Sequence, residues 1–100
     1  MEILLLIKRN IHSLEGKKLE GDGIQGVTMK LLVGKDDGAP TFAMRHFSVE
    51  TEGCTPCHQH PWEHEVLVIS GNGEIECDGQ VSSITGGDSI YVPANDLHQF

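Results

Sequence analysis

Basic side chains and long apolar runs are both scarce in this chain. Its 100 residues include 7 lysines and arginines against 15 aspartates and glutamates, which gives a formal net charge of -8. Such a chain repels phosphate backbones and anionic lipid headgroups, so we expect neither nucleic acid nor membrane as a partner. The apolar run at residues 3–7 is followed, not preceded, by Lys8 and Arg9, which fits neither a signal peptide nor a transmembrane span.

Cysteine is also sparse, and its count of three is odd. Cys54, Cys57 and Cys77 show no framework spacing, so we expect a cytoplasmic protein and not a disulfide-stapled secreted fold. Residues 54–58 read Cys-Thr-Pro-Cys-His, a pattern shared by covalent haem sites and, without the histidine, by redox dithiols. Haem would leave the other histidines without a role, and a redox dithiol needs a helix N-terminus that this segment does not predict. We interpret the first two cysteines as small residues at the start of a strand and Cys77 as a core residue.

Helical patterns are nearly absent, and we expect no more than a helical turn within Ser13–Glu20. The apolar residues fall in short runs broken at intervals of about ten residues by turn signals, which is typical of an all-β sandwich or barrel. We expect one domain over residues 1–100. The predicted strands are Glu2–Ile7, Gly26–Val33, Thr41–Glu50, His64–Ser70, Glu74–Cys77, Val81–Thr85 and Ser89–Val92.

Two of these strand predictions carry more detail. Asp78 and Gly79 separate two short extended runs and predict a type I′ hairpin turn, in which both central residues need positive φ. The strand from Thr41 alternates, and the alternation leaves open which of its two faces points inward. One face carries Ala43, Arg45, Phe47 and Val49, and the other carries Phe42, Met44, His46 and Ser48.

Histidines are concentrated in one place, at His58, His60 and His64, with His98 far along the chain. Imidazole is a ligand that suits Mn, Fe, Ni, Cu and Zn. Side chains at i and i+2 of a strand share a face about 7 Å apart, so His58, His60 and His64 have the same strand parity and can converge on one ion. An adjacent strand can bring His98 to the same place, so the four histidines predict a metal site.

Pro61 and Trp62 complicate this parity, because a proline interrupts a strand and can mark a bulge that changes the exposed face. Glu65 therefore stays open as an alternative third ligand. Trp62 itself fits a core position, a pocket wall or a dimer contact. We interpret His12 and His46 as surface or core histidines outside the site.

Two segments resemble the paired motifs of the cupin superfamily. The first motif is carried by Gly53, His58, His60, His64, Glu65 and Gly71, and the second by Gly87, Pro93 and His98. The resemblance implies a double-stranded β-helix, the jelly-roll barrel of that family. The run His-x-His-Pro-Trp-Glu-His-Glu is closer still to small manganese-type cupins whose ion is held by four histidines. In that subgroup the third ligand corresponds to His64, which frees Glu65 to orient a ligand by hydrogen bonding or to transfer a proton.

Three departures from the cupin pattern are visible, and the smallest is the spacing from Glu65 to Gly71, which is one residue short of the commonest pattern. The family often has glycine two residues after the proline of the second motif, where this chain has Asn95, another residue that tolerates positive φ. The sequence stops at Phe100, two residues after the last proposed ligand. We therefore expect a barrel without its usual C-terminal strands, or a partner chain that supplies the missing edge.

The proposed ligands indicate a function class. Four neutral imidazoles leave two open positions on an octahedral ion, which favours Lewis-acid or oxygen chemistry. Our first hypothesis is a metal-dependent enzyme, of dioxygenase or other oxidoreductase type, acting on a small organic molecule. The expected cofactor is one divalent transition metal, Mn or Fe first, with Ni, Cu and Zn as alternatives. The alternative function is a non-catalytic module that binds or senses a small ligand.

Arg45 and the strand edges extend this hypothesis. If its face points inward, Arg45 is placed to bind a substrate carboxylate through two hydrogen bonds; if it points outward, Arg45 is a solvated charge. Exposed strand edges and an apolar N-terminal strand favour pairing, and similar cupins are commonly dimers, so we expect a homodimer.

Overall fold

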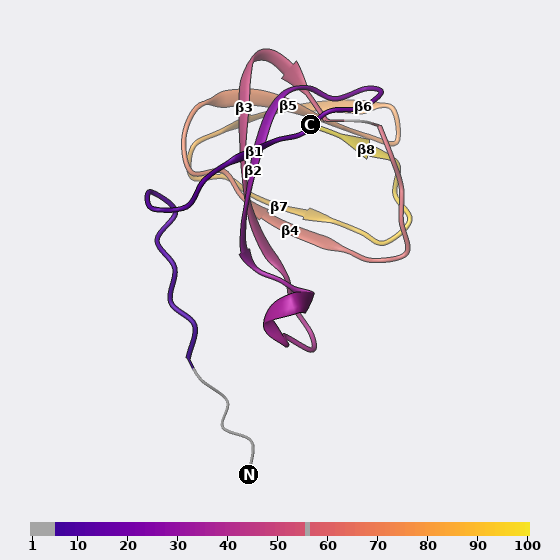
Figure 1. Ribbon diagram of the computed structural model, residues 1–100. Helices are drawn as coiled ribbons and strands as arrows, with labels where there is room; N and C mark the ends of the chain where they lie inside the picture. The colour runs from indigo at the N-terminus through magenta and orange to yellow at the C-terminus, as the bar shows by residue number, and fades with distance from the viewer. Residues whose placement is uncertain (1–5, 56) are drawn as a thin grey trace.

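The computed structural model describes residues 6–55 and 57–100, and they form antiparallel β-structure (Figure 1). The elements are β1 (Lys17–Lys18), β2 (Gln25–Val33), the 3-10 helix η1 (Lys35–Asp37), β3 (Met44–Cys54), β4 (His64–Leu67), β5 (Asn72–Cys77), β6 (Gln80–Thr85), β7 (Ser89–Val92) and β8 (His98–Gln99). They make three sheets, with strand orders β1-β2-β3, β4-β7 and β6-β5-β8. The predicted all-β class is confirmed.

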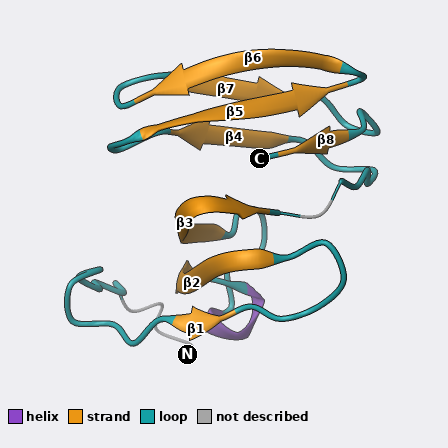
Figure 2. Ribbon diagram, turned by 90° about the horizontal axis from the view of Figure 1, so that it is seen from above, coloured by secondary structure: helices purple, strands orange, loops and turns teal. Residues whose placement is uncertain are grey.

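The sheets are arranged in two layers. Figure 2 shows β1, β2 and β3 on one side and the strands β4 to β8 on the other. The described chain contains no helix with the length and apolar character that a membrane crossing requires. Three apolar side chains, Val27, Ile75 and Val92, are buried in the described part of the chain, and His98 joins them with 2% of its surface exposed. The proposed ligand His98 is thus as inaccessible to solvent as the core residues.

The pairing of β2 with β3 is irregular near the start of β2 and the end of β3. The register jumps from Gln25 opposite Cys54 to Val27 opposite Val49, so extra β3 residues bulge out of the ladder. At this bulge a Cβ on Gly53 would lie 2.5 Å from the carbonyl oxygen of Gln25. Only glycine permits that approach of two backbones, which explains the glycine before the histidine segment.

The register also settles which face of β3 points inward. Val27 has no exposed surface and lies opposite Val49, while Arg45 lies opposite Leu31. Paired residues in an antiparallel ladder project to the same side, so Arg45, Phe47 and Val49 share the face of the buried Val27. The Arg45 guanidinium carbon lies 5.3 Å from the centroid of the Phe47 ring on that face.

The predicted hairpin is confirmed. Cys77 lies opposite Gln80, and the two residues between them, Asp78 and Gly79, have φ values of 50° and 81°. Asn95 also adopts positive φ, at 67°, as the comparison with glycine suggested. These are the backbone angles that the two turns require.

Other boundaries differ from the sequence predictions. The helical turn within Ser13–Glu20 is wrong, because β1 forms there by backbone pairing with β2, and its two exposed lysines give no strand pattern. The strand predicted from Thr41 begins at Met44 and runs to Cys54. The two-residue strand β8 was not expected. Most of the predicted Glu2–Ile7 strand lies outside the described residues, and its last two residues are not in a strand.

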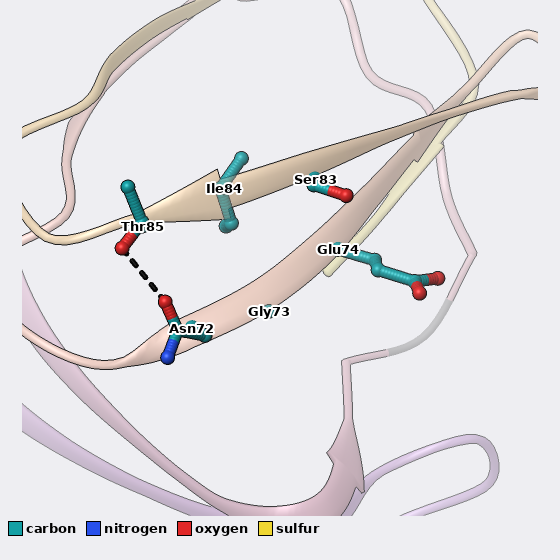
Figure 3. Close-up of a pocket in the computed structure, with 6 residues that line it drawn as sticks. All are labelled: Asn72, Gly73, Glu74, Ser83, Ile84 and Thr85. Atoms are coloured by element: carbon teal, nitrogen blue, oxygen red, sulfur yellow. Dashed lines mark hydrogen bonds between the residues drawn. The ribbon is translucent and has the colours of Figure 1, made fainter.

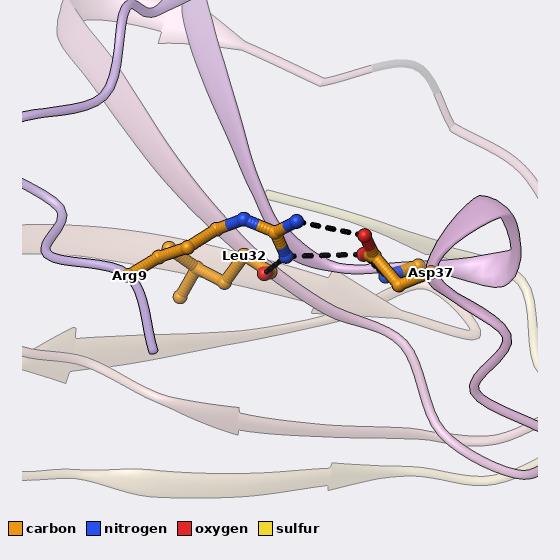
Figure 4. A network of polar contacts seen from close by, with 4 residues as sticks. Arg9, Leu32 and Asp37 are labelled. Carbon is orange, nitrogen blue, oxygen red and sulfur yellow. Dashed lines mark hydrogen bonds and ion pairs between the residues drawn. The ribbon is translucent and has the colours of Figure 1, made fainter. Parts of the chain in front are cut away.

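A polar clamp holds the N-terminal segment against the first layer (Figure 4). The Arg9 guanidinium donates two hydrogen bonds to Asp37, at 2.7 and 3.1 Å, and one to the carbonyl oxygen of Leu32. Asp37 also accepts a hydrogen bond from the backbone N–H of Gly34 at 2.9 Å. These donors, Arg9 foremost, hold the pKa of the Asp37 carboxyl below its usual value.

Candidate metal centre

The four proposed ligands come from different backbone settings. His64 is the first residue of β4 and His98 the first of β8, while His58 forms an isolated bridge with His98. The backbones of His58 and His98 exchange two hydrogen bonds, each of 3.0 Å. Residues 59–63 lie outside any strand, so the strand-parity argument is wrong for His60. His60 therefore reaches the site from a loop that runs to the start of β4 at His64.

The imidazoles nevertheless meet at one point. One ring nitrogen from each of His58, His60, His64 and His98 lies within 4.8 Å of the others. Nε2 of His60 and Nε2 of His64 lie 2.7 Å apart. Two nitrogens on opposite sides of a transition ion, each bound at about 2.1 Å, would be about 4.2 Å apart. The donor atoms and their spread therefore fit a divalent transition ion.

Backbone carbonyls fix the orientation of two of the rings. Nδ1 of His60 lies 2.8 Å from the carbonyl oxygen of Trp62, and Nδ1 of His98 lies 2.9 Å from that of Asp96. A carbonyl only accepts, so both Nδ1 atoms donate and carry the proton. Nε2 of His60 and His98 is then the unprotonated nitrogen, which is the form that a metal requires. Without an ion, the Nε2–H of His64 donates to Nε2 of His60.

Burial and nearby positive charge disfavour the protonated forms of His64 and His58. Burial, followed by the neighbouring charges of His60, His98, Arg45 and His58, lowers the pKa of His64 from 6.5 to about 4. Burial, with His98, His60 and Arg45, also lowers the pKa of His58. Because neutral imidazole is the ligating form, these shifts favour metal binding at neutral pH.

Glu65 and Arg45 occupy contrasting positions. Along β4 the half-buried His64 alternates with the exposed Glu65, and Glu65 lies opposite the exposed Tyr91. Glu65 therefore points away from the histidines, and the structure does not bring it to the site as a ligand or a proton-transfer group. Arg45 is solvent-exposed on the inner face of β3, and its charge acts on both His58 and His64.

The other two histidines and the cysteines lie outside the histidine group. His12 is exposed and His46 half-buried, and neither belongs to the histidine group. Cys54 and Cys57 are free thiols, as is Cys77.

Sequence reasoning did not find a second group of potential donors, Cys77, Asp78 and Asp96. Hydrogen bonds within the fold account for this proximity. The thiol of Cys77 faces Asp96 at 3.9 Å, and Asp78 accepts from the N–H of Leu97 at 3.3 Å.

Two hollow surfaces in the described chain lie away from the histidines. One open pocket of about 380 Å³ lies on the β5-β6 hairpin, where the Thr85 hydroxyl donates to the Asn72 side chain at 2.7 Å (Figure 3). A second, of about 420 Å³, lies between β5, β6 and β7. Neither is lined by any of the four ligands, so convergent donor chemistry and not concavity marks the site.

The sequence is similar to a family model and to a protein of known sequence. A family model described as a cupin domain matches residues 45–100. The alginate biosynthesis protein AlgA of Pseudomonas fluorescens is 35% identical over 60 residues, which make up 58% of this chain and 12% of that protein.

Solved structures that resemble the chain include the following three. The polyketide cyclase RemF of Streptomyces resistomycificus gives a TM-score of 0.88 at 26% identity, covering 96% of this chain and 69% of RemF. A cupin 2 conserved barrel domain protein of Rhodopseudomonas palustris gives 0.72 at 24% identity, covering 88% of this chain and 60% of that one. A cupin-2 domain protein of Rhodospirillum rubrum gives 0.73 at 22% identity, covering 100% and 67%.

Proposed function

This chain belongs to the cupin family, and from that premise we propose that it is a metal-dependent enzyme acting on a small organic molecule at the four-histidine site. The observation that carries the proposal is the convergence of four imidazole nitrogens within 4.8 Å of one another. Such a donor set suits Mn or Fe, and also Ni, Cu or Zn. A bound ion of this kind supplies Lewis-acid activation of the substrate or a site for oxygen chemistry.

The ligand set proposed is His58, His60, His64 and His98, as in the four-histidine subgroup. His64 is preferred to Glu65 because only the histidine lies within the group of converging donors. Backbone carbonyls present the Nε2 atoms of His60 and His98, and no carboxylate belongs to the group of converging donors. The positive charge of an ion would then stay uncompensated, which favours an anionic substrate.

Arg45 is the proposed substrate-binding residue. Its guanidinium is solvent-accessible on the inner face of β3, next to Phe47, and its charge is felt by His58 and His64. A substrate carboxylate would accept two hydrogen bonds from this group while its apolar part contacts the Phe47 ring.

Two reaction classes are proposed for this site. The first is the oxygenase chemistry expected from the ligands. The second is a cyclisation without oxygen, which the likeness to the polyketide cyclase RemF favours. Oxygen uptake during turnover of candidate aromatic and polyketide-like acids separates them, because only the first consumes oxygen. Binding of such acids without any turnover would support the alternative, a non-catalytic ligand-binding module.

Elemental analysis of the purified chain tests the metal site directly. We expect about one transition ion per chain, and its loss in His58→Ala and His98→Ala. His12→Ala is the matched control, since His12 is exposed and outside the donor group. Glu65→Gln should keep the ion if His64 is the third ligand. Full metal content in both ligand variants would refute the four-histidine site.

A further inference from the structure

Trp62 lies against one of the proposed ligands in an unusual way. Its ring stacks on the His60 ring with centroids 4.2 Å apart and planes 8° from parallel. It is the only tryptophan of the sequence, and 57% of its surface is exposed. An exposed indole contributes little to a core, so a packing role does not explain its position.

His60 needs outside support because it is not part of a strand. Its backbone carbonyl accepts a hydrogen bond from the N–H of Asn95 at 2.7 Å, which fixes the main chain but not the ring. The last side-chain torsion of histidine has a broad, two-fold preference. A half-turn of the ring would exchange Nδ1 with Cδ2 and Nε2 with Cε1, so Nε2 would lose its direction toward His64.

The same loop is anchored on its other side. The hydroxyl of Tyr91 on β7 donates to the Glu63 carboxylate at 2.7 Å, and Glu63 is the residue after Trp62. Trp62 contacts His60 through its indole face and through its carbonyl oxygen. The Tyr91–Glu63 hydrogen bond links the loop that carries Trp62 to β7.

From these contacts we propose that Trp62 is the positioning residue of His60. The indole face limits rotation of the imidazole, and the carbonyl keeps the proton on Nδ1, so Nε2 is presented to the other histidines before any ion binds. The metal-affinity consequence rests on the proposed function, but the orientation of the ring does not.

The experiment compares Trp62→Ala and Trp62→Phe with the wild-type chain and with Val81→Ala, a control on the outer face of β6 that is 59% exposed. All four proteins keep the backbone carbonyl at position 62, so differences report on the aromatic ring. Circular dichroism and thermal melting first establish that each variant is folded.

Nuclear magnetic resonance of the EDTA-treated proteins gives the first result. In the wild type, the His60 ring protons should show the upfield shift of a stacked indole, and the ring nitrogens the Nδ1–H tautomer. Trp62→Ala should lose the shift and show both tautomers, while Trp62→Phe and Val81→Ala keep one. A single unchanged tautomer in folded Trp62→Ala would overturn the proposal.

Titration with Mn²⁺ gives the second result. We expect Trp62→Ala to bind about tenfold more weakly, with substantial recovery in Trp62→Phe and wild-type affinity in Val81→Ala. Unchanged affinity in Trp62→Ala would also count against the proposal. If the wild-type chain binds no transition ion, the proposed function fails, and the resonance result still decides whether Trp62 orients His60.

Discussion

The metal-free protein should lose stability in mild acid because of His64. The ordinary pKa of histidine is 6.5, and the fold lowers that of His64 to about 4. Between these values the unfolded chain binds a proton that the folded chain does not bind. The contribution of His64 is therefore intact above about pH 6.5 and declines as the pH falls toward 4.

The size of this effect follows from the two pKa values. Linkage predicts a loss of about 2 kcal/mol in the free energy of unfolding between pH 7.5 and pH 5. His64 is half-buried, so solvent screens part of the effect, and we expect about 1 kcal/mol. Binding of an ion would oppose the loss, because protons and metal compete for the same nitrogen.

Urea unfolding in the presence of EDTA, followed by circular dichroism at several pH values, measures the loss. The comparison protein is His64→Gln, which cannot take up the proton, and His12→Gln controls for removal of an exposed histidine. His64→Gln should lose less stability in acid than the wild type by about 1 kcal/mol. If the free energy of unfolding has the same pH dependence in His64→Gln and in the wild type, the reasoning is refuted.

Two further predictions concern the backbone and the assembly. Gly53→Ala should lower the free energy of unfolding, measured in urea, by about 1 to 3 kcal/mol, because the new Cβ would meet the Gln25 carbonyl oxygen. Gly73→Ala is the control and should change this free energy little, since a Cβ there would have no neighbour nearer than 3.7 Å. Equal effects of the two substitutions would contradict the bulge argument. The side chains of Leu67 on β4 and Tyr91 on β7 are exposed and favour a homodimer. Light scattering should therefore give twice the mass of one chain for the wild type and the mass of one chain for Leu67→Asp. A wild-type monomer at all concentrations would exclude the homodimer.

Residue identities made much of the fold predictable. Short apolar runs and turn residues located most strands, and Asp78-Gly79 adopts the φ values that its hairpin requires. The missed strands are β1 and β8, two residues each, which form by backbone pairing and leave no side-chain pattern. Sequence periodicity detects faces of strands, not isolated hydrogen-bonded pairs.

The candidate site could likewise be predicted only in part. The spacing of the histidines, with the motif resemblance, selected the four that converge. Strand parity gave the wrong route for His60, because Pro61 places it in a loop. The inward face of Arg45 could not be predicted, since it depends on the register between β2 and β3, which one strand's sequence does not contain. The support from Trp62 depends on a ring contact that only coordinates reveal.

The bridge between His58 and His98 has a consequence for folding. These residues are 40 positions apart, since 98 minus 58 is 40, and β4 to β7 all lie between them. Their pairing closes a long loop, and the entropic cost of closing that loop opposes the approach of His58 and His98. A partly folded chain therefore offers only the local histidines 58, 60 and 64. High-affinity metal binding would then report that the chain has completed its fold, and an ion once bound would act as a reversible crosslink between distant segments.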